Sequence, residues 1–517
     1  MENNKQEKGR PAAGNAPADS QKGKDLKGIK LLPSQQPVFD KLKEFLAGSD
    51  KVFILKGYAG TGKTTIMRFL VQYLNKQHRG YRLLASTGRA AAVLKNNSGS
   101  DATTIHSMLY KYNGFNQDVS KIDATAQDVN GQLYLTFSPI AADEAEDDYV
   151  YIVDEASMVS NVADMNIIQA AFGSGKLLEE LLEYNTGPKA KFVFVGDPCQ
   201  LPPITQNFSP ALSADYLRNT FRLSAQEATL TEIVRQGAGS GIITASMQVR
   251  RQWEKAPEND WGYTHKVWGR LPIQANANIR LHTSQKELLD RYIDTVEQHG
   301  YGYSTFISRG NKTCYKVSQL VRSRLGRSGD VAVGDLLQVI QNNTLTGHTN
   351  GDFVLVESLD DKVISHCHLN FRKASVKNID TNISQTALLL TDTIHSTILN
   401  LDVDSQKRLF VDFIIRMKNK GIDPKKNKEV FDEAMRTDPY LNALRCTFGY
   451  AVTCHKSQGG EWQEVFVDMP RNIMLNPVKR NYQWTYTAMT RAKELLHLVN
   501  DFYLEGYDNR NRRFYVL

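Results

Sequence analysis

The sequence predicts an α/β fold with two units, each built around a parallel β-sheet that is covered by helices. One observation is the alternation of short apolar segments with amphipathic helical segments, as in KVFILKG (51–57) followed by TTIMRFLVQYLNKQ (64–77). Continuous apolar strands between helices are typical of a parallel sheet that is buried on both faces. The other observation is a second series of such segments, which begins with YSTFISRG (303–310) and resumes with EVFVDM (464–469).

The first unit is predicted to span roughly 29–236 and to be interrupted by residues 106–148. Its strands are KVFILKG (51–57), YRLLAST (81–87), YVYIVDEAS (149–157) and AKFVFVGD (190–197). The interruption contains NGQLYLTF (130–137), whose Asn-Gly turn and alternating pattern predict a small hairpin. Its aromatic residues Tyr134 and Phe137 have two interpretations, an exposed face for base stacking or the subdomain's own small core.

The second unit is interrupted by a segment of different character. Three short alternating stretches with Asn-Gly and Gly-Asp turns predict a small β-barrel: VAVGDLLQVIQNN (331–343), TNGDFVLVESL (349–359) and KVISHCHLNF (362–371). Residues 400–440 then predict charged helices, to which no motif assigns a role. We interpret His366-Cys367-His368 as ordinary strand residues, because positions 366 and 368 would share one face and no second ligand pair follows.

Composition excludes several classes of protein. The chain has 517 residues and a formal net charge of +7, which permits a polyanionic partner without requiring one. Its five cysteines form no C-x-x-C pair, which argues against a disulfide framework or a zinc ribbon and favours a reducing compartment. No apolar run approaches the roughly 18 residues of a membrane span. Residues 1–28 are polar, so we expect a disordered tail instead of a signal peptide, and a cytoplasmic protein.

The segment GYAGTGKT at 57–64 predicts a phosphate-binding loop between a strand and a helix. Glycines such as Gly57 and Gly62 let the backbone curl until its N–H groups face phosphate oxygens. The helix N-terminus adds positive potential at the same point. Lys63 is expected to reach the β- and γ-phosphates of ATP, and Thr64 to bind Mg²⁺.

Two further strands end in polar residues at the edge of the predicted sheet where ligands bind. VYIVDEAS ends in two carboxylates, of which Asp154 is expected to hold Mg²⁺ and Glu155 to activate the attacking water. FVFVGDPCQLPPI carries Asp197 and Gln200 after its strand. We expect Gln200 to orient water or to sense the γ-phosphate. An acidic pair alone is weak evidence, but a strand end downstream of a phosphate-binding loop favours a catalytic interpretation.

Nine segments in collinear order carry a resemblance to a known family. They are the spaced residues Leu31, Gln35 and Phe39, then GYAGTGKTT (57–65), ASTGRAA (85–91), TTIHSML (103–109), IVDEASM (152–158), GDPCQLPPI (196–204), LTEIVRQ (230–236), GYAVTCHKSQGGEW (449–462) and YTAMTRAKE (486–494). Together they resemble the motifs of superfamily 1 helicases, and more closely the RecD/Dda-like superfamily 1B group. The resemblance covers most of residues 31–517.

The resemblance implies two RecA-like P-loop domains with a small inserted pin subdomain and an SH3-like β-barrel insert. The implied divisions are a tail at 1–28, domain 1A at 29–105 and 149–236, a 1B pin at 106–148, domain 2A at 237–330 and 445–517, and a 2B insert at 331–444 that holds the barrel and the charged helices.

The resemblance also implies roles for individual residues. Gln35 should read the adenine, while Arg235 and Arg491 should reach the γ-phosphate from opposite sides of the cleft. The remaining nucleotide contacts are expected from Gly57, Gly60, Thr61, Gly62, Lys63, Thr64, Thr65 and Gln458. Contacts to the phosphates of single-stranded DNA are expected from Thr87, Arg89, His106, Thr453, His455 and Lys456.

The function implied is an ATP-dependent DNA helicase that uses Mg²⁺, moves along single-stranded DNA with 5′→3′ polarity and opens a DNA fork. We expect it to act as a monomer in replication, repair or recombination, with replication or repair proteins as further partners. Three alternatives stay open: a translocase that displaces proteins with little unwinding, a helicase subunit of a nuclease complex, and an RNA helicase. The polarity comes from the resemblance and not from any residue pattern.

Overall fold

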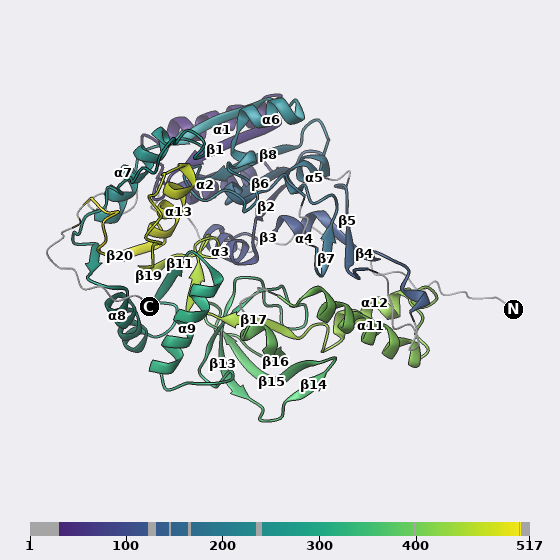
Figure 1. Cartoon of the computed structure of the whole chain (residues 1–517). Coiled ribbons are helices and arrows are strands. Elements are labelled where there is room, and N and C mark those ends of the chain that lie inside the picture. The colour runs from purple at the N-terminus through teal and green to yellow at the C-terminus, as the bar shows by residue number, and fades with distance from the viewer. Residues whose placement is uncertain are drawn as a thin grey trace.

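The structure is a computed structural model that describes residues 30–122, 131–143, 146–163, 167–233, 240–396, 400–505 and 507. The predicted tail at 1–28 and Arg235 lie outside the described residues. Two α/β units lie side by side, and a β-barrel with two adjoining helices lies below them in the view of Figure 1. Within the described ranges, none of the helices combines the length and the apolar character that crossing a membrane requires.

The first unit contains a parallel sheet of six strands in the order β3-β2-β6-β8-β1-β9. Its strands are β1 (Val52–Gly57), β2 (Tyr81–Ala85), β3 (Ala102–Thr104), β6 (Val150–Asp154), β8 (Lys191–Gly196) and β9 (Ala225–Leu230). The helices are α1 (Gln36–Ala47), α2 (Lys63–Lys76), α3 (Gly88–Ser98), α4 (Ile105–Leu109), α5 (Leu177–Tyr184) and α6 (Ala214–Phe221). Alternate residues of β1 enter opposite cores, Phe53 with α1 and α2, and Ile54 with α5 and α6. The sheet is therefore buried on both faces, as predicted.

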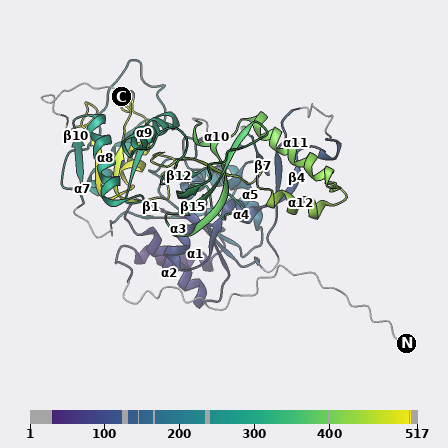
Figure 2. The ribbon, with the colours of Figure 1, turned by 90° about the horizontal axis from the view of Figure 1, so that it is seen from below.

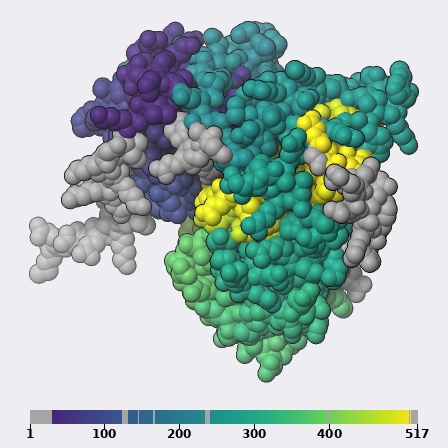
Figure 3. Space-filling view, turned by 90° about the vertical axis from the view of Figure 1, so that its left-hand side faces the viewer, coloured from purple at the N-terminus to yellow at the C-terminus, as the bar shows by residue number. Residues whose placement is uncertain are grey.

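The second unit contains a parallel sheet of five strands in the order β10-β20-β19-β11-β18. Its strands are β10 (Ile279–His282), β11 (Ser304–Ser308), β18 (Ala451–Thr453), β19 (Trp462–Val467) and β20 (Ala492–Val499). Its helices are α7 (Gly241–Lys255), α8 (Gln285–His299), α9 (Asn311–Arg324) and α13 (Lys479–Met489). Figure 3 shows the C-terminal residues (yellow) interleaved with teal residues of the same unit. The unit is thus assembled from two segments that are far apart in the chain.

The insert in the second unit is a closed barrel of five strands, which confirms the predicted SH3-like fold. The ring is β13-β12-β17-β16-β15, and β15 pairs back onto β13. Its strands are β12 (Leu336–Val339), β13 (Phe353–Leu359), β15 (Leu369–Asn378), β16 (Ser384–Leu390) and β17 (Leu444–Phe448), with the short β14 (Ile364–His366) beyond β15 and α10 (Thr391–Ile394) after β16. The barrel closes only with β17, whereas the sequence placed the return to the second unit at residue 445.

The insert in the first unit forms a separate sheet with the strand order β4-β5-β7. Strands β4 (Tyr110–Phe115) and β5 (Leu135–Pro139) pair antiparallel, and β7 (Ala170–Phe172) adds to β5 in parallel. This third strand comes from beyond residue 148, so the sheet is not contiguous in sequence. The Phe137 ring stacks on Phe172 with centroids 4.7 Å apart, and both rings pack against the apolar core of the first unit.

Helices α11 (Val403–Asn419) and α12 (Lys428–Thr437) join the barrel to the β4-β5-β7 sheet, and Figures 1 and 2 show them next to β4. The Phe115 and Phe410 rings meet edge to face at 5.2 Å. Lys418 Nζ donates to the backbone oxygen of Ser120 at 2.6 Å. These contacts form one apolar cluster with the barrel residue Phe371. The helices without an assigned role therefore brace the sheet inserted in the first unit.

One local prediction is wrong. The pattern around Cys367 is not a continuous strand, because Cys367 and His368 form the turn between β14 and β15 with φ angles of 52° and 60°. Alternation along a strand therefore does not apply to these residues.

Candidate nucleotide site and strand interface

The phosphate-binding loop connects β1 to α2 at the carboxyl edge of the first sheet. Gly60 and Gly62 adopt positive φ angles of 78° and 85°, which let the backbone curl over the start of the helix. A side chain at Gly57 would approach Lys63 Cγ to 2.7 Å, so the loop needs glycine there. Lys63 Nζ donates to the backbone oxygens of Gly57 and Tyr58 at 2.7 and 3.2 Å. The ammonium group is thus held at the mouth of the loop.

Gln35 is buried against this loop. Its Nε2 donates to the backbone oxygen of Thr61 at 3.2 Å, and its Oε1 accepts from the Leu32 N–H at 3.1 Å. Gln35 therefore ties the start of α1 to the phosphate-binding loop. Arg250 of α7 lies over the Tyr58 ring of the same loop, 4.0 Å from its centroid, and no sequence pattern indicates this contact.

The two carboxylates after β6 lie at the same edge of the sheet. Burial, and then the charge of Glu155, raise the pKa of Asp154 to about 7, and Lys63 opposes this shift. Glu155 adopts a left-handed backbone conformation with φ 49°, which is uncommon for a side chain of this type. Its Oε2 atom is buried and has no hydrogen-bond partner among the described residues. A strained backbone with an unpaired buried acid is an arrangement that functional sites maintain.

The loop after β8 adds two further polar groups. Burial raises the pKa of Asp197, whose Oδ1 accepts from the Cys199 N–H at 2.9 Å. Gln200 is buried, and its Oε1 has no partner among the described residues. Gln200 and Glu155 thus both present unpaired oxygens in the part of the first unit where the strands β6 and β8 end.

These groups fit the Mg²⁺ that a P-loop site employs. A divalent cation prefers oxygen ligands and would offset the cost of ionising a buried carboxylate. Asp154 is such a carboxylate, and Glu155 Oε2 lacks a donor among the described residues. Thr64, the second residue of α2, supplies a hydroxyl at the start of the helix. Asp154 and Thr64 are the residues that would hold the ion.

Tyr486 connects the second unit directly to this site. Its hydroxyl donates to Asp197 Oδ2 at 2.8 Å and accepts from the Ala59 N–H of the phosphate-binding loop at 2.9 Å. The residue is fully buried on α13. Tyr486 lies in the motif YTAMTRAKE, but the sequence does not indicate that its hydroxyl faces the other unit. The side chain touches both the phosphate-binding loop and a buried acid.

The loop 197–204 is held by four more hydrogen bonds from the second unit, one of which runs from Arg480 Nη2 to the Ile204 oxygen at 3.3 Å. Gln483 Nε2 donates to the Pro198 oxygen at 3.2 Å, and Thr487 Oγ1 accepts from the Leu201 N–H at 2.9 Å. Gln458 Nε2 donates to the Leu201 oxygen at 3.0 Å. Gln458 thus lies at the boundary between the units.

Arg491 follows α13 and stays within the second unit. Its guanidinium donates to the backbone oxygens of Thr487 and Gly460, at 3.0 and 3.2 Å, and to the Thr490 hydroxyl at 3.2 Å. Arg491 is also buried. The structure therefore places it one turn from the boundary without a contact to the phosphate-binding loop, and Arg235 lies outside the described residues.

Two of the predicted strand contacts lie at the N-terminus of α3, where the first unit, the barrel and the second unit meet. Thr87 caps the helix by accepting from the Ala90 N–H at 3.2 Å. The Arg89 guanidinium lies over the rings of Phe353 in the barrel and Trp462 in the second unit, at 5.0 and 5.1 Å. Burial lowers the pKa of Arg89, and its Nη1 has no partner among the described residues. Arg89 thus presents an unpaired donor between the three parts.

The other predicted strand contacts fall into two places. Thr453 is the last residue of β18 in the second unit, and His455 and Lys456 follow it. The neighbouring Gly459 packs against Ala90 of α3. Burial lowers the pKa of Lys456 to about 8. His106 lies apart from this group on α4, where its ring meets Phe172 of the inserted sheet at 5.3 Å. The loop that follows β18 therefore meets the start of α3 through Gly459, whereas His106 lies apart beside the inserted sheet.

The fold and the site define a two-unit P-loop protein whose nucleotide site lies at the boundary between the units. Residues 32–261 match the family model described as AAA domain, and residues 448–499 match the UvrD-like helicase C-terminal domain. These matches, with the relatives below, indicate a superfamily 1B helicase and confirm the resemblance predicted from the motifs.

Similar proteins include one of unassigned function and one helicase. An uncharacterized protein of Acanthamoeba polyphaga mimivirus is 23% identical over 89% of this chain and 98% of its own length. The ATP-dependent DNA helicase dda of Enterobacteria phage T4 is 23% identical over 59% of this chain and 60% of its own length. A crystal structure of Pif1 helicase from Bacteroides with ADP-AlF3 and ssDNA is 14% identical, with 92% and 93% coverage and a TM-score of 0.46.

The raised pKa of Asp154 gives a prediction for stability without metal or nucleotide. The folded protein keeps a proton on Asp154 up to about pH 7, whereas the ordinary value is 3.8, so folding becomes less favourable as pH rises between these values. The free energy of unfolding should fall by up to about 1.4 kcal/mol per pH unit in this window from this group. Asp154→Asn should remove that slope in urea unfolding measured with a chelator.

The control is Asp215→Asn, since the Asp215 side chain is 84% exposed on α6 and pairs only at the surface with Arg218. This variant should keep the parental pH dependence. Equal slopes for the parent and Asp154→Asn would contradict the buried, protonated state of Asp154.

Proposed function

We propose that this chain is an ATP-dependent DNA helicase that moves along single-stranded DNA with 5′→3′ polarity and opens duplexes as a monomer in the cytoplasm. The observation that carries the proposal is the set of hydrogen bonds from α13 and Gln458 to the phosphate-binding loop and to residues 197–204. A nucleotide that enters this site changes contacts made by both units. Binding and hydrolysis of ATP are thereby coupled to their relative movement.

The chemistry assigned to the nucleotide site is phosphoryl transfer to water. Mg²⁺, when bound, offsets charge on the phosphates. Lys63 and the loop N–H groups bind the β- and γ-phosphates, and Glu155 accepts a proton from the attacking water, which Gln200 orients. Arg491 must exchange its three bonds within the second unit for the γ-phosphate. Arg235 brings a second positive charge to the γ-phosphate, from the first unit.

Single-stranded DNA is assigned to the junction of α3, the barrel and the loop after β18. Thr87, Arg89, Thr453, His455 and Lys456 offer small polar and basic groups suited to phosphates without reading bases. His106 is assigned to the next part of the strand path, beside the inserted sheet. Two relatives, from Deinococcus radiodurans and Enterobacteria phage T4, are called ATP-dependent DNA helicases, which favours DNA over RNA. Replication and repair proteins are the expected partners.

The test is strand displacement on matched DNA and RNA duplexes with a 5′ or a 3′ single-stranded tail. We expect displacement of the DNA duplex with a 5′ tail, dependent on ATP and weakened by salt because phosphate contacts release counterions. Displacement of only the RNA duplex would make the chain an RNA helicase. Stimulated ATP turnover without displacement would favour a protein-displacing translocase, and displacement only from a 3′ tail would overturn the polarity.

Glu155→Gln serves as the control for these assays. It should bind ATP and single-stranded DNA like the parent, because the amide keeps the size of the side chain. Its turnover should collapse by about 10³-fold, a typical scale for loss of a group that acts on the reacting atoms. Near-parental turnover would remove Glu155 from the role of base.

Tyr486 is the positioning residue that we expect to couple the two units. Tyr486→Phe removes both hydrogen bonds of the hydroxyl, each worth about 1 kcal/mol. Turnover stimulated by single-stranded DNA should fall about tenfold, while the Kd for ATP changes less. Tyr482→Phe, one turn earlier on α13, is the matched control, since the Tyr482 hydroxyl makes no hydrogen bond among the described residues to the first unit. Full stimulation in Tyr486→Phe would remove the residue from the coupling.

Residues 106–148 and the barrel are proposed to serve unwinding and not ATP hydrolysis. The nucleotide residues lie in the two α/β units. Helices α11 and α12, by contrast, pack against the inserted sheet. Lys418→Ala removes the bonds to the oxygens of Ser120 and Ile122. Strand displacement should fall several-fold, with turnover stimulated by single strands within about twofold of the parent.

Lys420→Ala is the control for this experiment, because Lys420 is exposed at the end of the same helix. Both activities should be parental in that variant. Displacement at the parental rate in Lys418→Ala would show that the contact between α11 and the inserted sheet does not matter for unwinding. Loss of both activities would show damage to the two α/β units.

A further inference from the structure

A tight turn in the barrel insert is built from residues that rarely form one. Cys367 and His368 join β14 to β15, and both have φ angles in the left-handed region, 52° and 60°. Two-residue turns with this backbone are dominated by asparagine, aspartate and glycine. A cysteine and a histidine are held here against their preference, an arrangement that often accompanies a functional role.

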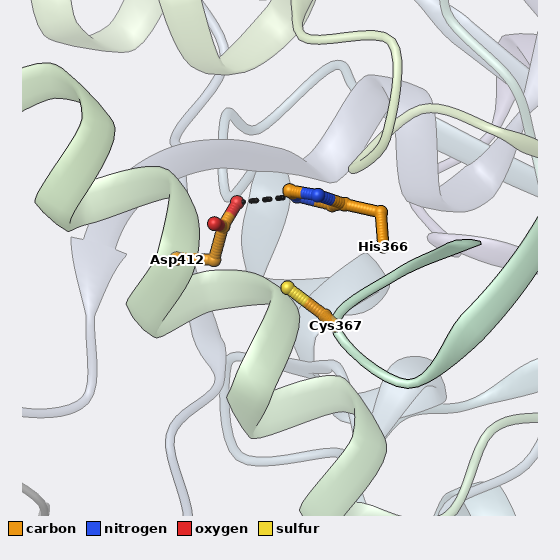
Figure 4. A group of neighbouring side chains, drawn as sticks. All are labelled: His366, Cys367 and Asp412. Carbon is orange, nitrogen blue, oxygen red and sulfur yellow. Dashed lines mark hydrogen bonds and ion pairs between the residues drawn. The ribbon is translucent and has the colours of Figure 1, made fainter. Parts of the chain in front are cut away.

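The turn places three different ligand atoms next to one another. Figure 4 shows Cys367 at the tip of the hairpin with its sulfur directed towards Asp412 of α11, beside the ring of His366. The ligand atoms of these three residues all lie within 4.8 Å of one another. His366 Nε2 is 2.8 Å from Asp412 Oδ2. Small side-chain rotations would bring the three atoms around a common centre.

The surroundings support such a centre. The His366 ring stacks on Tyr440 with centroids 4.0 Å apart, which fixes its orientation. Arg416 donates to Asp412 Oδ2 at 2.7 Å and also to Asp438, so its charge stays paired if Asp412 turns towards an ion. All three candidate ligands are half-buried, which leaves access for a metal ion and for a water ligand.

We propose that His366, Cys367 and Asp412 bind one transition-metal ion of the zinc class, with water as a fourth ligand. Imidazole nitrogen, thiolate sulfur and carboxylate oxygen are the ligands that Zn²⁺ takes in tetrahedral sites. A sulfur ligand disfavours Mg²⁺ and Ca²⁺, which require oxygen. On binding, the Cys367 thiol releases its proton to solvent and its sulfur forms the bond to the ion.

The ion would join the barrel to α11, the helix that packs against the inserted sheet. His366 and Cys367 belong to the hairpin β14-β15, and Asp412 lies on α11, two residues after Phe410. The Phe410 ring contacts Phe115 of β4. The site is separate from the Mg²⁺ site at the phosphate-binding loop. It gives α11 a role, because this helix would carry one ligand of the ion and also contacts the inserted sheet.

The test titrates the full, reduced, metal-free chain with Co²⁺ in excess Mg²⁺, which occupies the nucleotide site. Thiolate-to-cobalt charge transfer gives a near-ultraviolet absorption band, and one equivalent should saturate it. Zn²⁺ should abolish the band by displacement and raise the melting temperature. Cys367→Ser should lose the band, and Asp412→Asn and His366→Gln should weaken binding at least about tenfold, as disturbed metal sites do.

His368→Ala is the matched control, because His368 is the exposed neighbour in the same turn and is not one of the three ligands. It should retain the band and the stabilisation by Zn²⁺. Melting without metal checks that each variant is folded. The proposal is overturned if the parent shows no thiolate band, or if the band survives in Cys367→Ser, which would assign it to another cysteine.

Discussion

The hydroxyl of Tyr486 is the single group on which the arrangement of the two α/β units most depends. It donates to the buried carboxylate of Asp197 and accepts from the Ala59 N–H of the phosphate-binding loop. In a site that excludes water, these bonds are stronger than at the surface, and leaving either partner unpaired is costly. If the phosphate-binding loop moves when it binds a phosphate, these two bonds transmit the movement to α13. Arg491 lies just beyond the end of that helix.

Much of the nucleotide site could be predicted from sequence because its parts are local. The loop between β1 and α2 owes its shape to Gly60 and Gly62, and its function to the lysine that follows them. Asp154 and Glu155 were predictable because an apolar strand ends directly before them. The strand interface was predicted from motifs alone. Within it, the structure places Arg89 between Phe353 of the barrel and Trp462 of the second unit.

What sequence did not reveal depends on contacts between distant segments. Strand β7 joins the inserted sheet from residues 170–172, and no local pattern links it to β5. The barrel closes through β17, which is separated from β16 by the three helices α10, α11 and α12. The turn at Cys367 could not be predicted from strand alternation. Alternation does not indicate where residues with left-handed backbone angles form a turn. The direction of the Tyr486 hydroxyl belongs to the same group of features.

The interleaved second sheet sets the order in which the chain can fold during its synthesis. All strands of the first sheet precede residue 231, so that unit can form early. In the second sheet, β20 lies between β10 and β19, and β19 lies between β20 and β11. At about 5–20 residues per second, the ribosome needs roughly 10–40 s to proceed from Ser304 to Val499. Strand β11 has no neighbouring strand until β18 is complete at Thr453, and β10 has none until β20 is complete at Val499, so the backbone edges of both strands stay unpaired for most of that interval.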